Sequence, residues 1–241
     1  SAAAQPTRPE ARRRRRRAGA PITVPASFGS SGRPPGTSLP GSSPGRSGDE
    51  HAYQLSARRD TQAWELSASY TEVGRNFRPE VGFLSRTGGF RKPEFLIFHR
   101  YRPRNFLRLQ ELRPHLSYRG FWKPDGFQES GFVHLDNHWE FKSGHEVHTG
   151  INFIREGVAA PFEIAGVRVP AGTYNHREFQ LVATMNEGAP YVFRLRAQAG
   201  GFFGGTRVAL TPSATLRFSD LFNLELSLAR NDVDLPNGSF T

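Results

Sequence analysis

The sequence predicts an all-β fold, an antiparallel up-and-down meander of about nine or ten strands that forms a transmembrane β-barrel or an incomplete part of one. Two observations lead to this prediction. Segments of eight or more residues alternate between apolar and polar side chains, which gives each strand one apolar and one polar face. Short turns and longer loops follow one another in succession, as they do at the two rims of such a barrel.

The first half of the folded region shows four expected strands. They lie at residues 51–58, 62–73, 91–102 and 109–120. In the second of them, Trp64, Leu66 and Ala68 share one face, and polar side chains occupy the other. A long loop at residues 74–89 and a brief turn at residues 103–105 separate the later strands.

Residues 132–142 show the cleanest alternation, and the next strand is expected at residues 146–156. Apolar and polar faces must match across the hairpin between them. A two-residue loop would place Glu140 opposite an apolar side chain, whereas a three-residue loop at residues 143–145 places it opposite His148. We therefore expect the three-residue loop, in which glycine can adopt the left-handed conformation.

The remaining strands are expected at residues 178–186, 191–198, 206–218 and 222–231. They are separated by a short turn at residues 187–190, a glycine-rich loop around residues 204–205 and a short turn at residues 219–221. After residue 231 the chain is expected to enter an outer loop. The apolar positions of these segments are rich in Leu and Phe, which favours strands with one apolar face.

Alternation alone also fits a soluble β-sandwich, because each of its strands has one apolar face as well. Two further features favour the membrane. The apolar-face aromatic residues nearest the short turns would form an interfacial belt. They are Trp64, Tyr101, Trp139, Phe141, Tyr191, Phe193, Phe218 and Phe222. Arg177 and Arg230 lie on the apolar face near the expected outer rim, where a cation costs roughly 0–1 kcal/mol rather than about 2–4 kcal/mol at mid-membrane.

Composition divides the 241 residues into two parts. Residues 1–50 are rich in Ala, Pro, Gly, Ser and Arg, and we expect a disordered tail there. Residues 51–241 form the expected barrel segment. The arginine run at residues 12–17 has no interleaved aromatic residues, so we expect no nucleic-acid partner. No apolar stretch is long enough for a transmembrane helix, and the absence of cysteine excludes disulfides and thiolate sites.

The two ends of the sequence suggest a fragment or a mature piece of a longer protein. The chain begins without Met and without an apolar leader segment. At the other end, residues 229–241 enter the expected outer loop without a returning strand. We therefore expect a barrel segment that is truncated at its C-terminal end, with the rest of the barrel missing from this chain.

Several segments resemble a known bacterial family. They are WELSASYTEVGRNFRPEVGFLSR, ELRPHLSY, HLDNHWEFKSGHEVHTGINFIREG, VPAGTYNHREFQL and ARNDVDLPNGSFT. The resemblance is to the C-terminal domain of unknown function in proteins that carry an N-terminal family-9-like carbohydrate-binding domain. It covers roughly residues 51–241 and implies an outer-membrane β-barrel in a protein associated with carbohydrate binding. The resemblance supplies no catalytic residues.

The candidate site is a polar cluster on the face that would line the lumen. Its residues are Arg113, His115, His134, Asp136, His138, Glu140, His148, Glu178, Arg194 and Arg196. The period-two spacing of His134, Asp136 and His138 would also suit a divalent metal. We favour a polar row in which mixed charges pair with one another and with water. Glu140 and Glu146 could suggest glycoside hydrolysis, but we interpret them as part of a salt-paired cluster.

The sequence thus predicts a segment of an outer-membrane barrel, in contact with lipid, that serves passage or docking of a small polar solute. The resemblance alone implies that this solute is related to carbohydrate. We assign no enzyme activity, cofactor or metal. The alternative is a soluble secreted β-sandwich that binds carbohydrate or protein through its loops.

Overall fold

The computed structural model describes residues 49–79, 84, 86 and 88–241. The tail predicted at residues 1–50 lies outside the described residues, apart from Asp49 and Glu50. Within the described ranges, no helix is long and apolar enough to cross a membrane.

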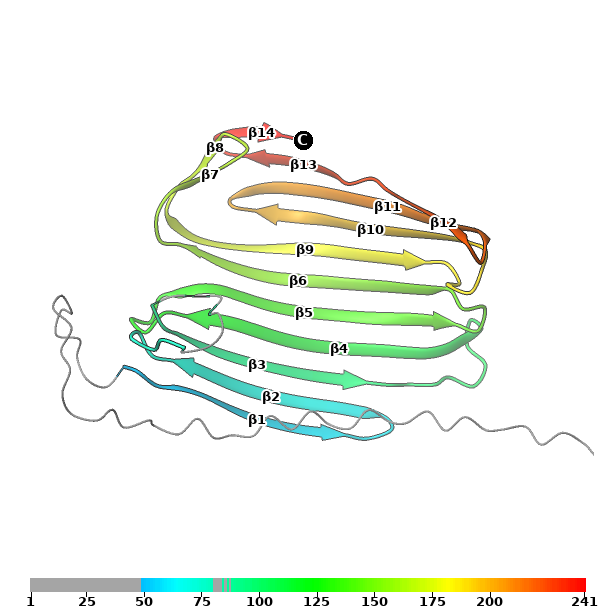
Figure 1. Cartoon of the computed structure of the whole chain (residues 1–241), viewed down its shortest axis with the longest axis horizontal. Coiled ribbons are helices and arrows are strands. Elements are labelled where there is room, and N and C mark those ends of the chain that lie inside the picture. Colours follow the sequence, from blue (N-terminus) through cyan, green and yellow to red (C-terminus); the bar gives the residue numbers. More distant parts are fainter. Residues whose placement is uncertain (1–48, 80–83, 85, 87) are drawn as a thin grey trace, which may run out of the picture.

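The described chain forms an antiparallel meander, so the predicted all-β meander is confirmed, although its large sheet has twelve strands rather than about nine or ten (Figure 1). Its strands are β1 (Ala52–Asp60), β2 (Trp64–Val73), β3 (Phe90–His99), β4 (Leu109–Trp122), β5 (Gln128–Phe141), β6 (Glu146–Val158), β7 (Phe162–Ile164), β8 (Val167–Val169), β9 (Gly172–Thr184), β10 (Tyr191–Phe202), β11 (Gly205–Ser219), β12 (Phe222–Ser227), β13 (Arg230–Leu235) and β14 (Gly238–Phe240). Strands β7 and β8 form a separate hairpin, and the other strands form one sheet.

The large sheet is open. Strand β1 is at one edge, and β12, β13 and β14 are at the other, with no pairing between these edges among the described strands. Figure 1 shows the two edges on opposite sides of the sheet. The described strands therefore form an open sheet rather than a closed barrel.

The connections gather at two rims. Five connections, between β1 and β2, β3 and β4, β5 and β6, β9 and β10, and β11 and β12, lie together at the rim that we call the turn rim, on the right of Figure 1. The opposite loop rim carries the remaining connections, including the β7–β8 hairpin, except the one between β12 and β13, which lies opposite the middle of β11 (Figure 1). The predicted glycine-rich loop at this rim is present but shorter than expected, because only Phe203 and Gly204 separate β10 from β11. Both have positive φ, 42° and 85°, as a type I′ hairpin turn requires.

The predicted strand at residues 222–231 and the outer loop after it need correction. Strand β12 ends at Ser227 and pairs with the second half of β11, whereas β13 pairs with the first half of β11. Strand β14 then forms a hairpin with β13. Val233 and Leu235 of β13 are buried in a small apolar cluster with Val167 and Val169 of β8. This burial explains why the segment is a strand and not a solvated loop.

The predicted register between β5 and β6 is also wrong. The loop has three residues and Gly144 has the expected positive φ of 83°, but the closing pair is Phe141 and His145, joined by a hydrogen bond from the Phe141 N–H to the His145 carbonyl of 2.9 Å. Glu140 therefore lies opposite Glu146, and His138 lies opposite His148. The two carboxylates tolerate this position because Arg113 of β4 pairs with both of them.

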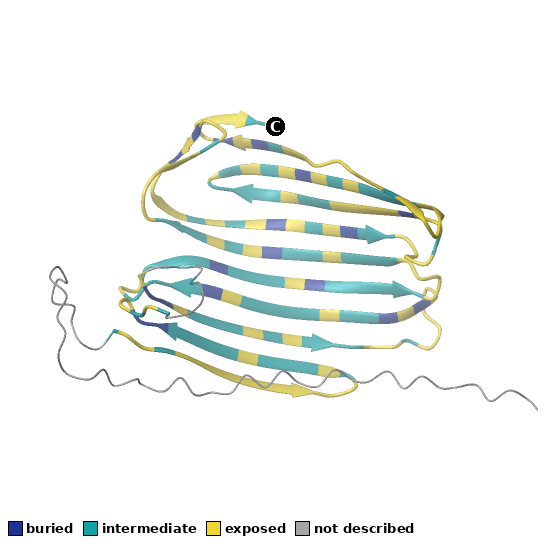
Figure 2. Ribbon diagram, viewed as in Figure 1, coloured by how far each residue is buried: buried dark blue, intermediate teal, exposed yellow. Residues whose placement is uncertain are grey.

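Buried, intermediate and exposed residues are interspersed along the strands (Figure 2), and burial is reversed between the two faces of the sheet. The polar face holds the buried polar side chains Asp136, Asn152 and Glu178, which are 4%, 1% and 3% exposed. On the apolar face, Leu135 is 48% exposed and Phe179 is 66% exposed. A protein in water normally buries its apolar face and exposes its polar one. Among the described residues, buried apolar side chains form a cluster only at the loop rim.

Candidate functional site

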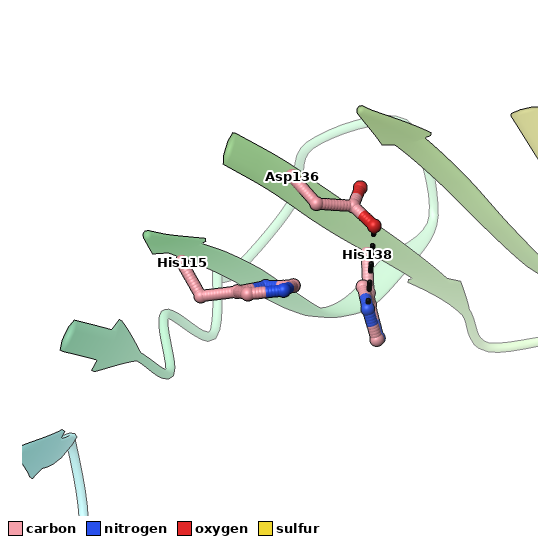
Figure 3. Close-up of side chains that lie close together, drawn as sticks. All are labelled: His115, Asp136 and His138. Carbon is pink, nitrogen blue, oxygen red and sulfur yellow. Dashed lines mark ion pairs between the residues drawn. The ribbon is translucent and has the colours of Figure 1, made fainter. Parts of the chain in front are cut away.

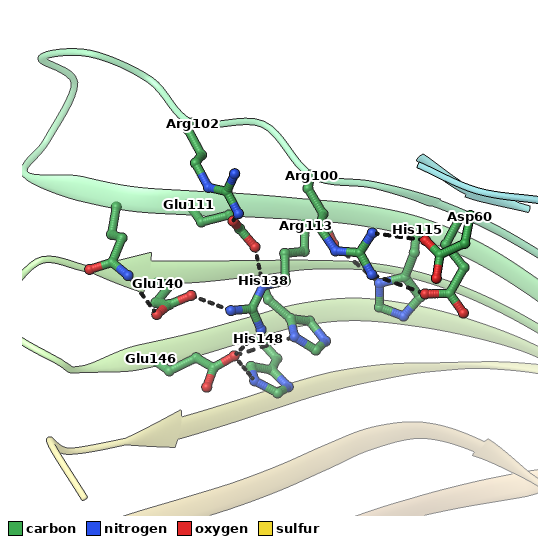
Figure 4. A network of polar contacts seen from close by, with 12 residues as sticks. Asp60, Arg100, Arg102, Glu111, Arg113, His115, His138, Glu140, Glu146 and His148 are labelled. Atoms are coloured by element: carbon green, nitrogen blue, oxygen red, sulfur yellow. Dashed lines mark hydrogen bonds and ion pairs between the residues drawn. The ribbon is translucent and has the colours of Figure 1, made fainter. Parts of the chain in front are cut away.

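A network of charged side chains occupies the polar face at β4, β5 and β6 (Figure 4). Its centre is Arg113 of β4, whose Nε donates to Glu111 Oε1 at 2.7 Å. The same guanidinium pairs with Glu140 of β5 and lies 3.7 Å from Glu146 Oε1 of β6. Arg102 Nη2 lies 2.6 Å from the second oxygen of Glu111. One arginine thus joins carboxylates from three neighbouring strands, which is possible because these positions share the period-two polar face.

Four histidines lie beside this network. The ring centroids of His138 and His148 are 3.6 Å apart and their planes are nearly parallel, at 10°. His115 lies 5.1 Å from His134 and 5.1 Å from His138, again between centroids. His148 Nε2 and His138 Nδ1 approach the same Glu146 oxygen, at 3.0 Å and 3.3 Å. The register of β5 and β6 produces this gathering, because it aligns His138 with His148.

A chain of hydrogen bonds connects this cluster to β9, β10 and β11. His134 Nδ1 lies 2.6 Å from Asn152 Oδ1, and Asn152 Nδ2 donates to Glu178 Oε1 at 3.2 Å. Glu178 also accepts a hydrogen bond from Gln198 Nε2 at 3.0 Å and pairs with Arg207. The buried carboxylate of Glu178 therefore has three donors, as a buried anion requires.

The polar face is hollowed near the turn rim. A cavity of about 440 Å³ lies between the ends of β5, β6, β9 and β10. Glu140, Glu146, His148, Arg194 and Arg196 contribute to its wall. The wall thus carries carboxylate, imidazole and guanidinium groups. Such a mixed lining can donate hydrogen bonds to a polar solute and accept them from it.

The structure brings most of the predicted cluster together. Arg113, His115, His134, Asp136, His138, Glu140 and His148 are within one patch of β4, β5 and β6. Glu178 joins it through Asn152. Arg194 and Arg196 instead line the cavity, and Arg194 Nη2 donates to Glu187 on the adjacent turn at 2.6 Å.

Sequence reasoning missed five members of the network. They are Arg102, Glu111, Asn152, Gln198 and Arg207. The last four occupy polar-face positions of their strands, so the period-two pattern already placed them on the correct face. Their partners lie on other strands, however, and only the register of several hairpins places those partners opposite them.

A second charged group lies on the polar face of β1, β2 and the end of β3. Arg58 Nη2 lies 2.9 Å from Glu65 Oε1, and Arg100 Nη2 donates to Glu65 Oε2 at 3.0 Å. Arg100 also approaches Asp60 at 3.7 Å (Figure 4). Charge pairing therefore continues along the polar face as far as the β1 edge.

The predicted aromatic belt lies at the turn rim. Six of its members are exposed: Trp64, Tyr101, Tyr191, Phe193, Phe218 and Phe222. Phe218 and Phe222 stack across the turn between β11 and β12, with centroids 5.6 Å apart. Trp139 and Phe141 are half-buried, and Trp139 Nε1 donates to Thr149 Oγ1 at 2.9 Å. All eight positions are within a few residues of a turn-rim connection.

The carboxylates of Glu140 and Glu146 have the surroundings of a structural ion-pair network. Both face the guanidinium of Arg113.

Comparisons with protein-family models, curated proteins and solved structures found no match. The function is therefore argued from the geometry of the sheet and its polar face.

Proposed function

We propose that this chain forms part of the wall of a β-barrel in a bacterial outer membrane, and that its polar face docks or passes a small polar solute. The observation that carries the proposal is the reversed burial of the two faces. Leu135, Phe153 and Phe179 are exposed on one face, while Asp136, Asn152 and Glu178 are buried on the other. Lipid is the environment in which such a sheet is stable.

The energetic reason is the cost of leaving the apolar face in water. Burying apolar surface contributes roughly 25 cal/mol per Å², and the exposed large apolar side chains extend from β1 to β12. An apolar surface of this extent is typical of a membrane or partner contact. The aromatic belt at the turn rim adds support, because Trp and Tyr favour the membrane–water interface.

The alternative of a soluble β-sandwich needs a second sheet against the apolar face. In the described chain, the only second sheet is the two-stranded β7–β8 hairpin. Its Val167 and Val169 pack against β13 at the loop rim and leave the middle of the apolar face uncovered. The geometry therefore favours the membrane.

An open edge in lipid would leave backbone N–H and C=O groups without partners, which the hydrocarbon region does not tolerate. We therefore propose that the edges at β1 and at β12–β14 pair with further strands when the sheet is in the membrane. The polar face would then line the interior, where its ion pairs stay in contact with water.

The solute part of the proposal rests on the cavity at the turn rim. Its wall carries Glu140, Glu146, Arg194 and Arg196, so both acidic and basic groups can bind hydroxyl groups. The family resemblance in the sequence is the reason to propose a carbohydrate-related solute.

Refolding in detergent tests the membrane part. The full chain is compared in plain buffer and in detergent micelles by circular dichroism and by gel mobility with and without heating. We expect strand signal and heat-modifiable mobility in micelles only. A monodisperse chain that unfolds cooperatively in plain buffer would overturn the membrane assignment and favour the sandwich.

Calorimetric titration of the refolded chain with neutral mono- and oligosaccharides tests the solute part. We expect binding that is weakened by Arg196→Gln, which changes the cavity wall. Arg58→Gln is the matched control, because Arg58 lies on the polar face far from the cavity. Binding that is absent, or equally weakened by both changes, would reject the cavity as the docking site.

A further inference from the structure

Half of the histidines of this protein gather in one place. The chain has eight histidines, and His115, His134, His138 and His148 lie together on the polar face of β4, β5 and β6. Imidazole is a common ligand for zinc, copper, iron and nickel. A carboxylate, Asp136, lies in the middle of the group.

Asp136 is unusual because its carboxylate is buried and incompletely hydrogen-bonded. It is 4% exposed, and its Oδ1 is buried with no hydrogen-bond partner. Its Oδ2 lies 3.4 Å from His134 Nε2 and 3.8 Å from His138 Nε2. A buried carboxylate normally has its lone pairs satisfied by donors or by a metal. Oδ2 is the oxygen that faces the histidines, and a cation bound between them would balance the charge of this buried, incompletely hydrogen-bonded carboxylate.

The backbone of β6 leaves room for the Asp136 carboxylate. Gly150 lies directly opposite Asp136. A Cβ at Gly150 would be 3.2 Å from Asp136 Cγ and 3.2 Å from the carbonyl oxygen of Leu135. A side chain at this position would crowd the carboxylate, so the glycine keeps the position open.

The neighbouring histidines are oriented as ligands. His115 Nδ1 lies 3.2 Å from the carbonyl oxygen of Arg113, which leaves Nε2 available. His138 Nδ1 lies 3.3 Å from Glu146 Oε1, and its Nε2 is the nitrogen nearer Asp136. Metal-bound histidines usually direct their second ring nitrogen at a carbonyl or a carboxylate in this way.

We propose that His115, Asp136 and His138 bind one divalent transition-metal ion, with zinc as the ion that best suits two imidazoles and one carboxylate (Figure 3). One ligand atom from each residue lies within 4.8 Å of the others. Tetrahedral zinc places its ligands roughly 3.3 Å apart, so small side-chain rotations complete the site. Three protein ligands would leave the fourth position of a tetrahedral ion to water or a solute.

A second trio, His138, Glu146 and His148, has similar spacing but is the weaker site. Glu146 is more exposed than Asp136, and the guanidinium of Arg113 lies 3.7 Å from its Oε1. An arginine at this distance already supplies positive charge and repels a metal ion. Among the described residues, the ion pairs of Asp136 are with histidines only. Of these two histidines, His138 belongs to the proposed site, where an imidazole binds a metal in its neutral form.

Cobalt titration of the full chain tests this inference. The chain is folded in detergent micelles, or in plain buffer if it folds there, so that failure of the membrane proposal does not remove the test. We expect visible absorption bands of tetrahedral Co²⁺ that saturate at one ion per chain and disappear when Zn²⁺ is added. His115→Gln, Asp136→Asn and His138→Gln should each weaken binding by more than about 10-fold.

Two control variants separate this site from other sources of binding. His145→Gln removes an exposed histidine on the adjacent turn and should leave binding unchanged. His148→Gln should also leave it nearly unchanged. Equal loss in His145→Gln would mean adventitious surface binding, and loss in His148→Gln without loss in His115→Gln would assign the ion to the second trio. Either result, or no binding at all, would overturn the proposal.

A thermal measurement covers the case in which a variant fails to fold. Zinc that binds the folded chain should raise the unfolding midpoint of the unchanged protein in proportion to the logarithm of its concentration. A variant that folds, as judged by circular dichroism, should lose this shift if its side chain is a ligand. An unchanged midpoint for the unchanged protein would contradict the proposal without any variant.

Discussion

Glu178 is buried on the polar face and depends on its partners. Asn152 and Gln198 donate neutral hydrogen bonds to it, and Arg207 supplies the only ion pair that Glu178 makes among the described residues. Burying a carboxylate without a cation is costly, because its charge loses the stabilisation that water provides. The stability of this part of the sheet should therefore be sensitive to Arg207.

Arg207→Met removes the charge and keeps most of the side-chain volume. We expect the free energy of unfolding to fall by about 3–5 kcal/mol, because the change leaves Glu178 buried and without its cation. Arg230→Met is the control, since its ion pair with Asp232 is exposed and such pairs contribute about 0–1 kcal/mol. The measurement is urea unfolding of the refolded chain. Equal losses in the two variants would show that Glu178 does not depend on Arg207.

Strand β9 offers an internal comparison for the apolar face. Phe179 is in the middle of the strand on the apolar face, and Met185 directly follows its last residue at the turn rim, beside the cavity. If the sheet spans a membrane, Phe179→Lys should destabilise it by about 2–4 kcal/mol and Met185→Lys by about 0–1 kcal/mol. Unfolding from lipid bilayers measures both. Both residues are exposed. If the two variants lose the same free energy of unfolding within about 0.5 kcal/mol, the apolar face contacts water rather than lipid.

The sequence predicted which segments are strands and on which face of the sheet each side chain lies, because both depend on the period-two pattern within one segment. Register could not be predicted as well. The apolar and polar pattern of the hairpin placed Glu140 opposite His148, yet Glu140 lies opposite Glu146, and Arg113 of the neighbouring strand β4 pairs with both carboxylates. A hairpin considered alone does not include that neighbour. The contact between His138 and His148 escaped prediction for the same reason.

The end of the chain shows a second limit of local pattern. The residues from Asp232 onward were expected in an outer loop, yet Asp232 belongs to β13, which begins at Arg230 and ends at Leu235. Their strand forms because β11 has fifteen residues and can pair with two short strands in succession. The burial of Val233 against β8 stabilises it. Both conditions involve segments that are distant in the sequence, so residues 230–235 alone give little indication that they form a strand.

At the scale of the whole molecule, the central claim is that the sheet has a lipid face and a water face. The claim unites the reversed burial, the aromatic belt at the turn rim and the ion pairs of the polar face. It also explains how the candidate metal site could reach water while the opposite side of the same strands contacts lipid. The absence of cysteine in the sequence makes the claim directly measurable.

The most direct measurement is a scan of single-cysteine spin labels along residues 179–183 of β9 in lipid vesicles. Labels at Phe179, Leu181 and Ala183 should be relaxed mainly by oxygen, which concentrates in lipid. Labels at Gln180 and Val182 should respond less to oxygen and more to water-soluble chromium oxalate, giving a period of two residues. A scan without this alternation, or with the odd-numbered positions preferring the aqueous reagent, would contradict a membrane-spanning sheet.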